Sequence, residues 1–363
     1  MGTDENLIQV KDGCHPLCND PQSLIILIYI MFPVGKFAGR FAKALTLIVF
    51  YAAAAKLPAH AAPYQKLTLA GPTAVVTFPL LHMVETKALG QYTDKLEFRL
   101  WQSPDQLRVL LAKKDIDFSA APSNLPALMA NRGDPVRLLN ISVWGILWLV
   151  SRDPDIHGFS DLAGKELLVP FQRDLPAVLL DTLLDAQPFE PEKSPILRRT
   201  RDSQDAIALM LTGQGQHVLL VEPTASLLMS RNAQQGGAPL YRVQSLEAAW
   251  QQSFPDQAEL PQAGVMVNSH RAHDLELSRA VEQAYAHSAA WCSSNALDCA
   301  KMVHRHIPHL PVPAIESAIK VTRLDSRPAS SIRPQLEDLY QLLGKQNPQA
   351  IGGRLPDPGF YGP

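Results

Sequence analysis

The sequence predicts an α/β fold of two lobes, each a β-sheet flanked by helices, joined by a hinge. The main observation is an internal repeat, because residues 103–129 and 203–229 share one pattern. Both segments begin with Ser-x-Asp and continue with apolar residues at helical spacing. A short strand, a proline and a helix that begins with Ser or Thr then follow. A repeat of this kind indicates two similar structural units. The chain of 363 residues, 46% of them apolar, is long enough for two cores.

The repeat extends to a complete β-α-β-α-β-α unit. Strands are expected at 66–71, 96–100 and 116–119 in the first lobe, and at 166–170, 196–200 and 217–221 in the second. Helices are expected to begin near Thr77, Ser103 and Ser123 in the first lobe, and near Asp174, Ser203 and Thr224 in the second. The two lobes are therefore predicted to share one topology.

Two segments are expected to connect the lobes. Residues 138–152 form an apolar, β-branched and aromatic run without helical periodicity, which predicts extended chain passing from the first lobe to the second. A strand at 263–269 marks the return, and helices follow at 275–307 and 331–343. The predicted limits are 62–143 plus 269–349 for the first lobe, 144–268 for the second, and 350–363 for a flexible tail.

Residues 1–61 are predicted to contain a secretory signal peptide. Basic residues precede an apolar run at 44–55, and Ala59-His60-Ala61 supplies small residues for cleavage before Ala62. We expect translation to start at Met31, because a signal normally stands at the extreme N-terminus. The alternative is a retained anchor helix, although the apolar run is short for a membrane span.

Cleavage would leave Cys292 and Cys299 as the cysteines of the mature chain. Cys14 and Cys18 would be removed, and their spacing is not a metal site without further ligands nearby. In an oxidising compartment two cysteines can form a disulfide, but seven residues apart on one straight helix their α-carbons would be about 10 Å apart. A helix end at 293–295 would bring them together, so a disulfide and two free thiols both stay open.

Charge and motifs exclude several classes of function. The formal net charge of −2 leaves no basic field for a nucleic acid. The sequence has no G-x-S-x-G elbow, Walker loop or H-E-x-x-H motif, and no cofactor is expected. His304, His306 and His309 could share a zinc ion, but they stand at the end of a C-terminal helix away from the expected ligand edge. We therefore predict no metal site.

The candidate ligand-binding residues follow from the strand order. In an open parallel sheet, ligands bind beyond the carboxyl ends of the strands, where loops lead into helix N-termini with free N–H groups. Two such edges facing each other across a hinge would form a cleft for a small polar, anionic solute. The candidates in these loops and at the crossing are Thr73, Thr77, Phe78, Ser119, Ser123, Asn124, Trp144, Phe171, Arg173, Asp174, Glu222 and Thr224.

Several of these candidates also have a purely structural interpretation. Ser123, Asp174 and Thr224 are ordinary helix N-caps whatever binds nearby. Arg173 could be a solvated surface residue. Trp144 could pack in the core of the hinge or form the floor of the cleft.

Four short phrases and the order of elements carry a family resemblance. The phrases are DLAGK at 161–165, ANRG at 130–133, LWLVSR at 147–152 and VEP at 221–223. Over residues 64–343 the chain resembles type II periplasmic solute-binding proteins of ABC transporters, nearest to the nitrate, taurine, alkanesulfonate and thiamine-precursor branch. The resemblance implies two lobes that close on a small ligand and deliver it to a membrane permease with its ATPase.

The resemblance leads to a first expectation and an alternative. The first is a monomeric periplasmic binding protein that performs no chemistry. The alternative is an enzyme on the same scaffold, a pyrimidine-precursor synthase or a chorismate dehydratase, with Asp174 or Glu222 as acid or base. A sensor or adaptor without a transport role is a third interpretation. The two carboxylates depart from a pure oxyanion binder and leave room for a ligand with a donor or cationic group.

Overall fold

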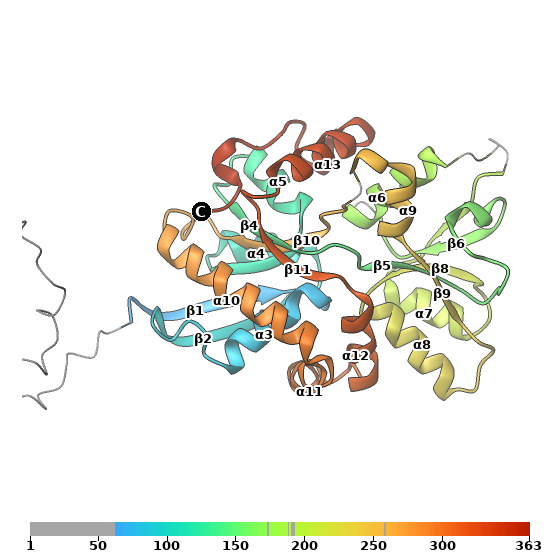
Figure 1. Cartoon of the computed structure of the whole chain (residues 1–363), viewed down its shortest axis with the longest axis horizontal. Helices are drawn as coiled ribbons and strands as arrows, with labels where there is room; N and C mark the ends of the chain where they lie inside the picture. Colours follow the sequence, from blue (N-terminus) through green and yellow to red (C-terminus); the bar gives the residue numbers. More distant parts are fainter. Residues whose placement is uncertain (1–61, 173, 188, 190–192, 258) are drawn as a thin grey trace, which may run out of the picture. The chain divides into compact units, whose positions relative to one another are not determined.

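The computed structural model describes residues 62–363 except 173, 188, 190–192 and 258. These residues belong to one compact unit, Ala62–Pro363 (Figure 1). The predicted signal peptide, its cleavage site, Met31, Cys14 and Cys18 lie outside the described residues. No described helix has the length and hydrophobicity needed to cross a membrane.

The first lobe begins with three parallel strands and three helices. The elements are β1 (Tyr64–Gly71), α3 (Phe78–Glu85), β2 (Thr93–Leu100), α4 (Pro104–Ala112), β3 (Phe118–Pro122) and α5 (Asn124–Asn131). A 3-10 turn, η1 (Val75–Thr77), leads into α3. The strands stand in the order β2-β1-β3, with β1 paired in parallel to both neighbours.

The second lobe repeats this arrangement about one hundred residues later. Its elements are β6 (Glu166–Val169), α6 (Leu175–Ala186), β7 (Ile196–Arg199), α7 (Ser203–Leu211), β8 (His217–Val221) and α8 (Thr224–Gln234). The order β7-β6-β8 is again parallel. The predicted duplication of one topology is therefore confirmed.

The apolar run at 138–152 divides into two strands that belong to different sheets. β4 (Arg137–Val143) lies in the first sheet and β5 (Leu147–Ser151) in the second, so the chain crosses between the lobes at 144–146. β5 stands between β8 and β9 (Tyr241–Ser245), antiparallel to both. The five-stranded sheet then has the order β7-β6-β8-β5-β9.

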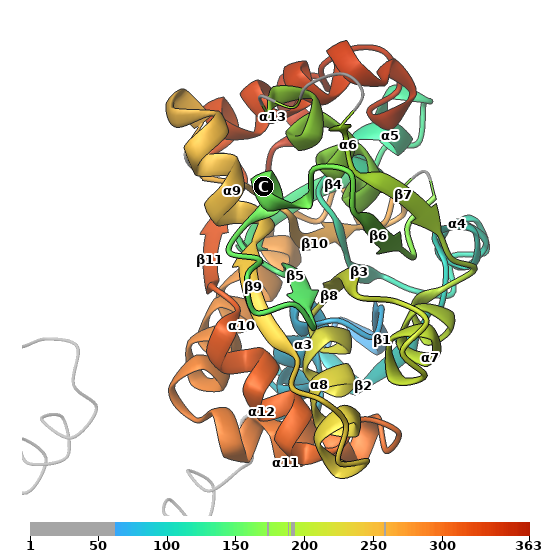
Figure 2. The ribbon, with the colours of Figure 1, turned by 90° about the vertical axis from the view of Figure 1, so that its right-hand side faces the viewer.

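The return crossing comes before the strand predicted to mark it. β10 (Ala263–Val267) lies between β3 and β4 and is antiparallel to both, so this strand belongs to the first sheet and not to the second lobe, to which residues up to 268 were assigned. The second lobe ends instead after α9 (Leu246–Ser253) and the 3-10 turn Pro255–Gln257. With β11 (Leu324–Pro328) the first sheet has the order β11-β4-β10-β3-β1-β2 (Figures 1 and 2).

The C-terminal helices cover the first lobe and also contact the second. α10 (Leu275–Ser294) packs against α3, and α11 (Ala296–His306) packs against α12 (Val312–Val321). α12 in turn lies beside α8 of the second lobe in both views (Figures 1 and 2), with Ser226 Oγ donating a hydrogen bond to Ser317 Oγ at 3.1 Å. α13 (Arg333–Gln346) contacts α6.

Cys292 and Cys299 form a disulfide at the junction of α10 and α11. The helix breaks at Asn295, as the sequence indicated, which brings the two α-carbons to 5.1 Å. Both cysteines are fully buried. Of the two alternatives, the disulfide is the one observed.

The C-terminal residues differ from the expected flexible tail. Tyr361 forms a β-bridge with Leu138, and Gly362 N donates to Leu138 O at 2.7 Å. Ile351, Phe360 and Tyr361 are buried in a cluster with residues of β4 and α13. Glycines and prolines in this segment indicated a loose end, but its three large apolar side chains fix it to the first lobe.

Candidate ligand-binding site

Loops from both lobes converge on a small cavity between the two sheets. The cavity has a volume of about 90 Å³ and meets the loop after β1, the end of β3, the start of α6 and the end of β8. Its remaining lining comes from the two crossings, at Ile146, Leu147, Gln262 and Ala263. The carboxyl ends of the strands thus meet where the topology of an open parallel sheet predicts a ligand site. We call this space the inner cavity.

The inner cavity is apolar. Its described lining residues are Pro72, Ala74, Val76, Pro122, Ile146, Leu147, Leu175, Pro176, Leu179, Val221, Gln262 and Ala263. Gln262 is the one residue of this set with a polar side chain. The strand ends and helix starts that were expected to present hydroxyl groups therefore present aliphatic groups to this space.

Gln262 is held in place by three hydrogen bonds. Its N–H donates to Val143 O at 3.0 Å, its backbone oxygen accepts from Ser123 N at 2.9 Å, and its Oε1 accepts from Ile146 N at 2.8 Å. Because Ile146 N can only donate, the side-chain oxygen must face it and the NH₂ group must face away. Gln262 is 3% exposed, and its Nε2 has no hydrogen-bond partner among the described residues.

A second, larger space adjoins the inner cavity. This outer cavity has a volume of about 780 Å³, and Pro122 and Leu175 line both spaces. Its described lining residues are Ser103, Pro104, Asp105, Arg108, Pro122, Asn124, Leu125, Leu128, Arg132, Pro170, Gln172, Asp174, Leu175, Arg201, Asn347, Gln349 and Ala350. The outer cavity therefore carries three arginines, two aspartates and several amides, and it is polar where the inner cavity is not.

The candidates of the first loop are engaged within the first lobe. Thr77 Oγ1 donates to Pro72 O at 2.6 Å, and Phe78 is fully buried in the core. Thr73 lies directly between Pro72 and Ala74, which line the inner cavity, but is not itself part of that lining. This loop contributes Pro72, Ala74 and Val76 to the cavity, not its hydroxyl groups.

The candidates in β3 and directly after it have three different environments. Ser119 Oγ accepts from Trp101 Nε1 at 3.0 Å and donates to Ala120 O, so it is part of the core. Ser123 is fully buried, and its Oγ has no partner among the described residues. Asn124 lines the outer cavity and donates from Nδ2 to Ala350 O at 2.9 Å.

The loop after β6 places one carboxylate at the outer cavity. Asp174 lines it and precedes α6, but no side-chain capping bond is formed and its Oδ1 has no hydrogen-bond partner in the described part of the chain. Burial raises the pKa of the Asp174 carboxyl, while nearby backbone N–H groups and Arg199 act in the opposite direction. Phe171 is buried and its backbone oxygen accepts from Arg199 at 2.6 Å. Arg173 lies outside the described residues.

Glu222 and Thr224, at the end of β8, do not line either cavity. Glu222 has no exposed surface; its Oε1 accepts from Arg242 Nη2 at 2.7 Å and its Oε2 from Ser226 N at 3.1 Å. Thr224 is half-buried at the first position of α8. The N-cap is Pro223, joined to Glu222 by a cis peptide bond, so Thr224 is not the cap expected from the sequence.

Trp144 packs in the core beside the first crossing. It is fully buried, and its Nε1 donates to Asp325 O at 2.7 Å. The guanidinium groups of Arg323 and Arg327 lie over its ring, at 5.2 Å and 4.6 Å from the centroid. Of the two alternatives for this residue, core packing is the one observed.

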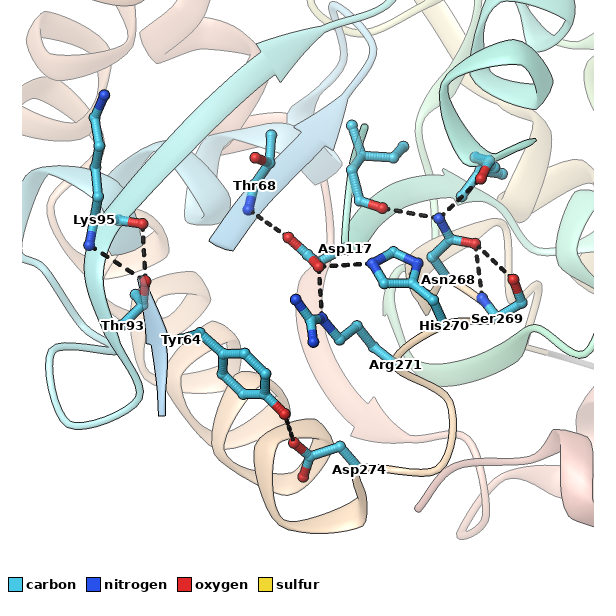
Figure 3. A network of polar contacts seen from close by, with 12 residues as sticks. Tyr64, Thr68, Thr93, Lys95, Asp117, Asn268, Ser269, His270, Arg271 and Asp274 are labelled. Carbon is cyan, nitrogen blue, oxygen red and sulfur yellow. Dashed lines mark hydrogen bonds and ion pairs between the residues drawn. The ribbon is translucent and has the colours of Figure 1, made fainter. Parts of the chain in front are cut away.

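A polar network stands at the opposite end of the first sheet (Figure 3). Asp117, just before β3, accepts from Thr68 N at 2.8 Å, from Arg271 Nε at 2.7 Å and contacts His270 Nε2 at 2.9 Å. Tyr64 donates to Asp274 and lies under the Arg271 guanidinium. The network fastens the N-terminus of α10 to the amino ends of β1 and β3, away from the strand ends that meet the cavities.

The three histidines near the end of α11 contact other groups or solvent. His304 Nδ1 lies 2.7 Å from Leu310 O, His306 Nε2 lies 2.8 Å from Glu85 Oε1, and His309 is exposed. Within the described ranges, no group of three or more His, Cys, Asp or Glu side chains is arranged to hold a metal ion.

The residues that line the inner cavity are not among the candidates predicted from the sequence. Gln262 and Ala263 stand where the chain returns to the first lobe, and Ile146 and Leu147 stand at the first crossing. The one signal for them was the Pro261-Gln262 pair directly before a predicted strand. The arginines of the outer cavity and Asn347 are not among the candidates predicted from the sequence, although Arg132 stands in the ANRG phrase at 130–133 and Arg108 in the repeated segment at 103–129.

The fold matches solved structures of transport proteins. An ABC transporter protein from Parabacteroides distasonis has a TM-score of 0.67 at 19% identity, covering 82% of this chain and 99% of that one. The periplasmic aliphatic sulphonate-binding protein SsuA from Escherichia coli has a TM-score of 0.58 at 15% identity, covering 81% and 93%. The periplasmic nitrate-binding protein NrtA from Synechocystis PCC 6803 has a TM-score of 0.58 at 13% identity, covering 80% and 85%.

These likenesses confirm the predicted resemblance at the level of the fold. The chain has the two-lobed α/β architecture of periplasmic binding proteins of ABC transporters. No protein-family description and no curated protein sequence matches the chain.

Proposed function

We propose that the chain is the substrate-binding component of an ABC importer. In this proposal it is exported by the segment before Ala62, closes around a small organic anion between its lobes, and presents the solute to a membrane permease. The observation that carries the proposal is the convergence of four strand-end loops, two from each lobe, on one cavity beside the two crossings. A ligand that contacts both lobes stabilises the closed arrangement by its differential affinity for it.

The expected acidity of the solute is supported by the outer cavity. Arg108, Arg132 and Arg201 line it, against Asp105 and Asp174. Asp105 is already paired with Arg108 at 2.6 Å. Arg201 contacts Asp205 at 3.4 Å, and a carboxylate or sulfonate group near Arg132 would gain a charge-assisted hydrogen bond.

The test is native mass spectrometry of the full chain purified with its bound solute, followed by small-angle X-ray scattering before and after the solute is removed and returned. We expect one small organic solute per chain and a decrease in the radius of gyration when it is returned. Arg132→Gln should weaken rebinding, whereas Arg198→Gln, which alters an exposed pair between Arg198 of β7 and Glu166 of β6, should not. The proposal fails if no solute is found and no small molecule changes the scattering.

The enzymatic alternative loses one of its two candidate residues. Glu222 is buried and paired with Arg242, so it has no access to a substrate in either cavity. Of these two carboxylates, Asp174 is the one that lines a cavity. Turnover of a solute identified by mass spectrometry, abolished by Asp174→Asn, would favour the enzyme over the transport role.

A further inference from the structure

We infer that the solute is a short-chain aliphatic acid whose alkyl end occupies the inner cavity while its acidic group stays in the outer cavity. This inference rests on the proposed function and names the class of solute. It is drawn from the lining of the inner cavity, from the hydrogen bonds of four loop N–H groups, and from the buried Nε2 of Gln262, which has no partner among the described residues.

The lining of the inner cavity disfavours a bare oxyanion. Eleven of its twelve described residues have aliphatic or proline side chains. Moving a charged group from water into such a lining without compensating hydrogen bonds is strongly unfavourable. Burial of an alkyl group in the same space is favourable by about 0.8 kcal/mol for each CH₂.

Four backbone N–H groups of the strand-end loops are already engaged. Ala74 N donates to Pro72 O and Thr77 N to Ala74 O, both at 2.9 Å. Ser123 N donates to Gln262 O at 2.9 Å, and Glu222 N donates to Ile146 O at 2.9 Å. In three of the four strand-end loops these N–H groups therefore bond within the loop or to one of the two crossings. These loops do not offer them to a ligand.

Gln262 adds one specific polar contact to this apolar space. Its Oε1 is fixed by Ile146 N, and its buried Nε2 has no partner among the described residues. A buried donor without a hydrogen-bond partner is unfavourable by about 1 to 3 kcal/mol. A hydrogen-bond acceptor on the ligand would remove this penalty. A carbonyl oxygen part-way along the alkyl chain is the group that fits a neutral donor in an apolar lining.

The two cavities together set the length and polarity of the solute. The inner volume of about 90 Å³ is smaller than the roughly 150 Å³ apolar cavity known to hold benzene, so a short alkyl group fits better than an aromatic ring. The outer cavity adjoins it at Pro122 and Leu175 and contains the arginines. The acid group therefore lies in the outer cavity, whose lining includes Arg132 and Arg201.

The first experiment is isothermal titration calorimetry of the full chain with sodium carboxylates from acetate to octanoate, with benzoate, nitrate and taurine for comparison. Affinity should rise about fourfold for each added CH₂ until the inner cavity is filled, and then stop rising. Nitrate and taurine should bind more weakly than the best carboxylate. Tighter binding of nitrate, taurine or benzoate, affinity independent of chain length, or no binding by any carboxylate would overturn the inference.

These outcomes separate the inference from the proposed function. A solute that co-purifies and closes the lobes but has no alkyl end would overturn the inference and leave the transport proposal standing. Absence of any solute and of any closure would overturn both. Identification of the co-purified solute by mass spectrometry decides between these two results.

Two variants test the inner cavity directly. Ala74 is half-buried in the lining of the inner cavity, so Ala74→Leu would fill part of this space. If the cavity holds alkyl groups, the preferred carboxylate should become shorter by about two carbons.

Gln262→Glu keeps the acceptor for Ile146 N but replaces the free NH₂ donor. The affinity of 4-oxopentanoate relative to its isostere 4-methylpentanoate should then fall about tenfold, as expected for one lost hydrogen bond to a ligand. Gln251→Glu, the same change at an exposed position of α9, should leave this ratio unchanged, and an unchanged ratio in Gln262→Glu would contradict the role of Gln262.

Discussion

Arg242 of β9 donates a hydrogen bond from Nη2 to the fully buried carboxylate of Glu222 at 2.7 Å. The same nitrogen donates to Ser226 Oγ at 2.8 Å, and the other oxygen of Glu222 accepts from Ser226 N. This pair ties the end of β8 and the start of α8 to the edge strand of the second sheet. The sequence made Glu222 a candidate for ligand binding, but its carboxylate is part of a buried structural ion pair.

Replacing Glu222 by Ala should lower the free energy of unfolding by about 3 to 5 kcal/mol, because it leaves the Arg242 guanidinium in a largely buried position without its partner. Urea denaturation followed by circular dichroism measures the change. Glu222→Gln keeps an acceptor for Ser226 N and should cost less. A loss below about 1 kcal/mol in Glu222→Ala would show that the pair contributes little to stability.

The disulfide between Cys292 and Cys299 should contribute to stability by restricting the unfolded chain. For so short a loop, the loop-closure relation gives about 2.5 kcal/mol. Thermal unfolding with and without a phosphine reductant should show a lower midpoint after reduction. In the Cys292→Ala/Cys299→Ala variant the reductant should have no further effect, and a shift there would assign the effect to other cysteines.

Glu247 should make the stability of the second lobe depend on pH. Burial raises the pKa of the Glu247 carboxyl to about 7, with Arg323 at 3.6 Å opposing and Glu259 adding to the rise. The folded state then binds a proton more tightly than the unfolded state, so this group favours folding below its usual pKa near 4.5, and that contribution is lost as pH rises to about 7. Chemical denaturation at pH 5 and pH 8 measures the difference.

Glu247→Gln should weaken this dependence and raise stability at pH 8 relative to the native chain. The glutamine keeps the shape of the side chain and removes its charge. Arg323 retains Glu259, which it contacts at 2.6 Å, so the variant does not leave this arginine without a carboxylate. Equal pH dependence in the two proteins would contradict the role of Glu247.

Gly264 should not tolerate a side chain. It lies in β10 between β3 and β4, and a Cβ atom at this position would stand 1.8 Å from Asn140 O and 2.9 Å from Ile141 Cα. Both neighbours are backbone atoms, so Gly264→Ala requires the strands to separate. We expect a loss of at least about 3 kcal/mol in urea denaturation, or no folded protein.

Gly213 provides the matched control for that substitution. Its φ is 74°. Apart from its two chain neighbours, no described residue has an atom within 4 Å of where a Cβ would stand. Gly213→Ala therefore meets only the conformational penalty of a left-handed residue, about 1 to 2 kcal/mol. Equal losses in the two variants would show that the close approach of β4 to Gly264 does not limit this position.

The fold could be predicted from the sequence because both lobes show the same local sequence patterns. Parallel strands buried on both faces appear as short apolar runs, and Ser103 caps α4 with its side chain accepting from Gln106 N as expected. In the second lobe Asp202 performs this role, one residue before the Ser203 predicted for it. A difference of one residue at a helix end is within what local patterns can resolve.

The site was harder to predict because its lining depends on pairing between distant residues. Which side of a loop faces the cavity follows from contacts such as Ser123 N to Gln262 O, which join segments more than one hundred residues apart. Glu222 looked accessible because its partner Arg242 lies in β9, a polar strand with no strong apolar pattern. The prediction relied on hydroxyl groups near helix starts, whereas the side chains that line the inner cavity include their apolar neighbours.

The position of β10 sets the order in which the polypeptide can fold. The second lobe is built from one continuous stretch and has all of its strands by Ser245. The first sheet must wait for β10, because this strand fills the gap between β3 and β4. Until β10 has docked, β3 keeps an open edge, and closing the gap requires contacts of high sequence separation, which form slowly. The lobe that begins the chain is therefore the last to be completed.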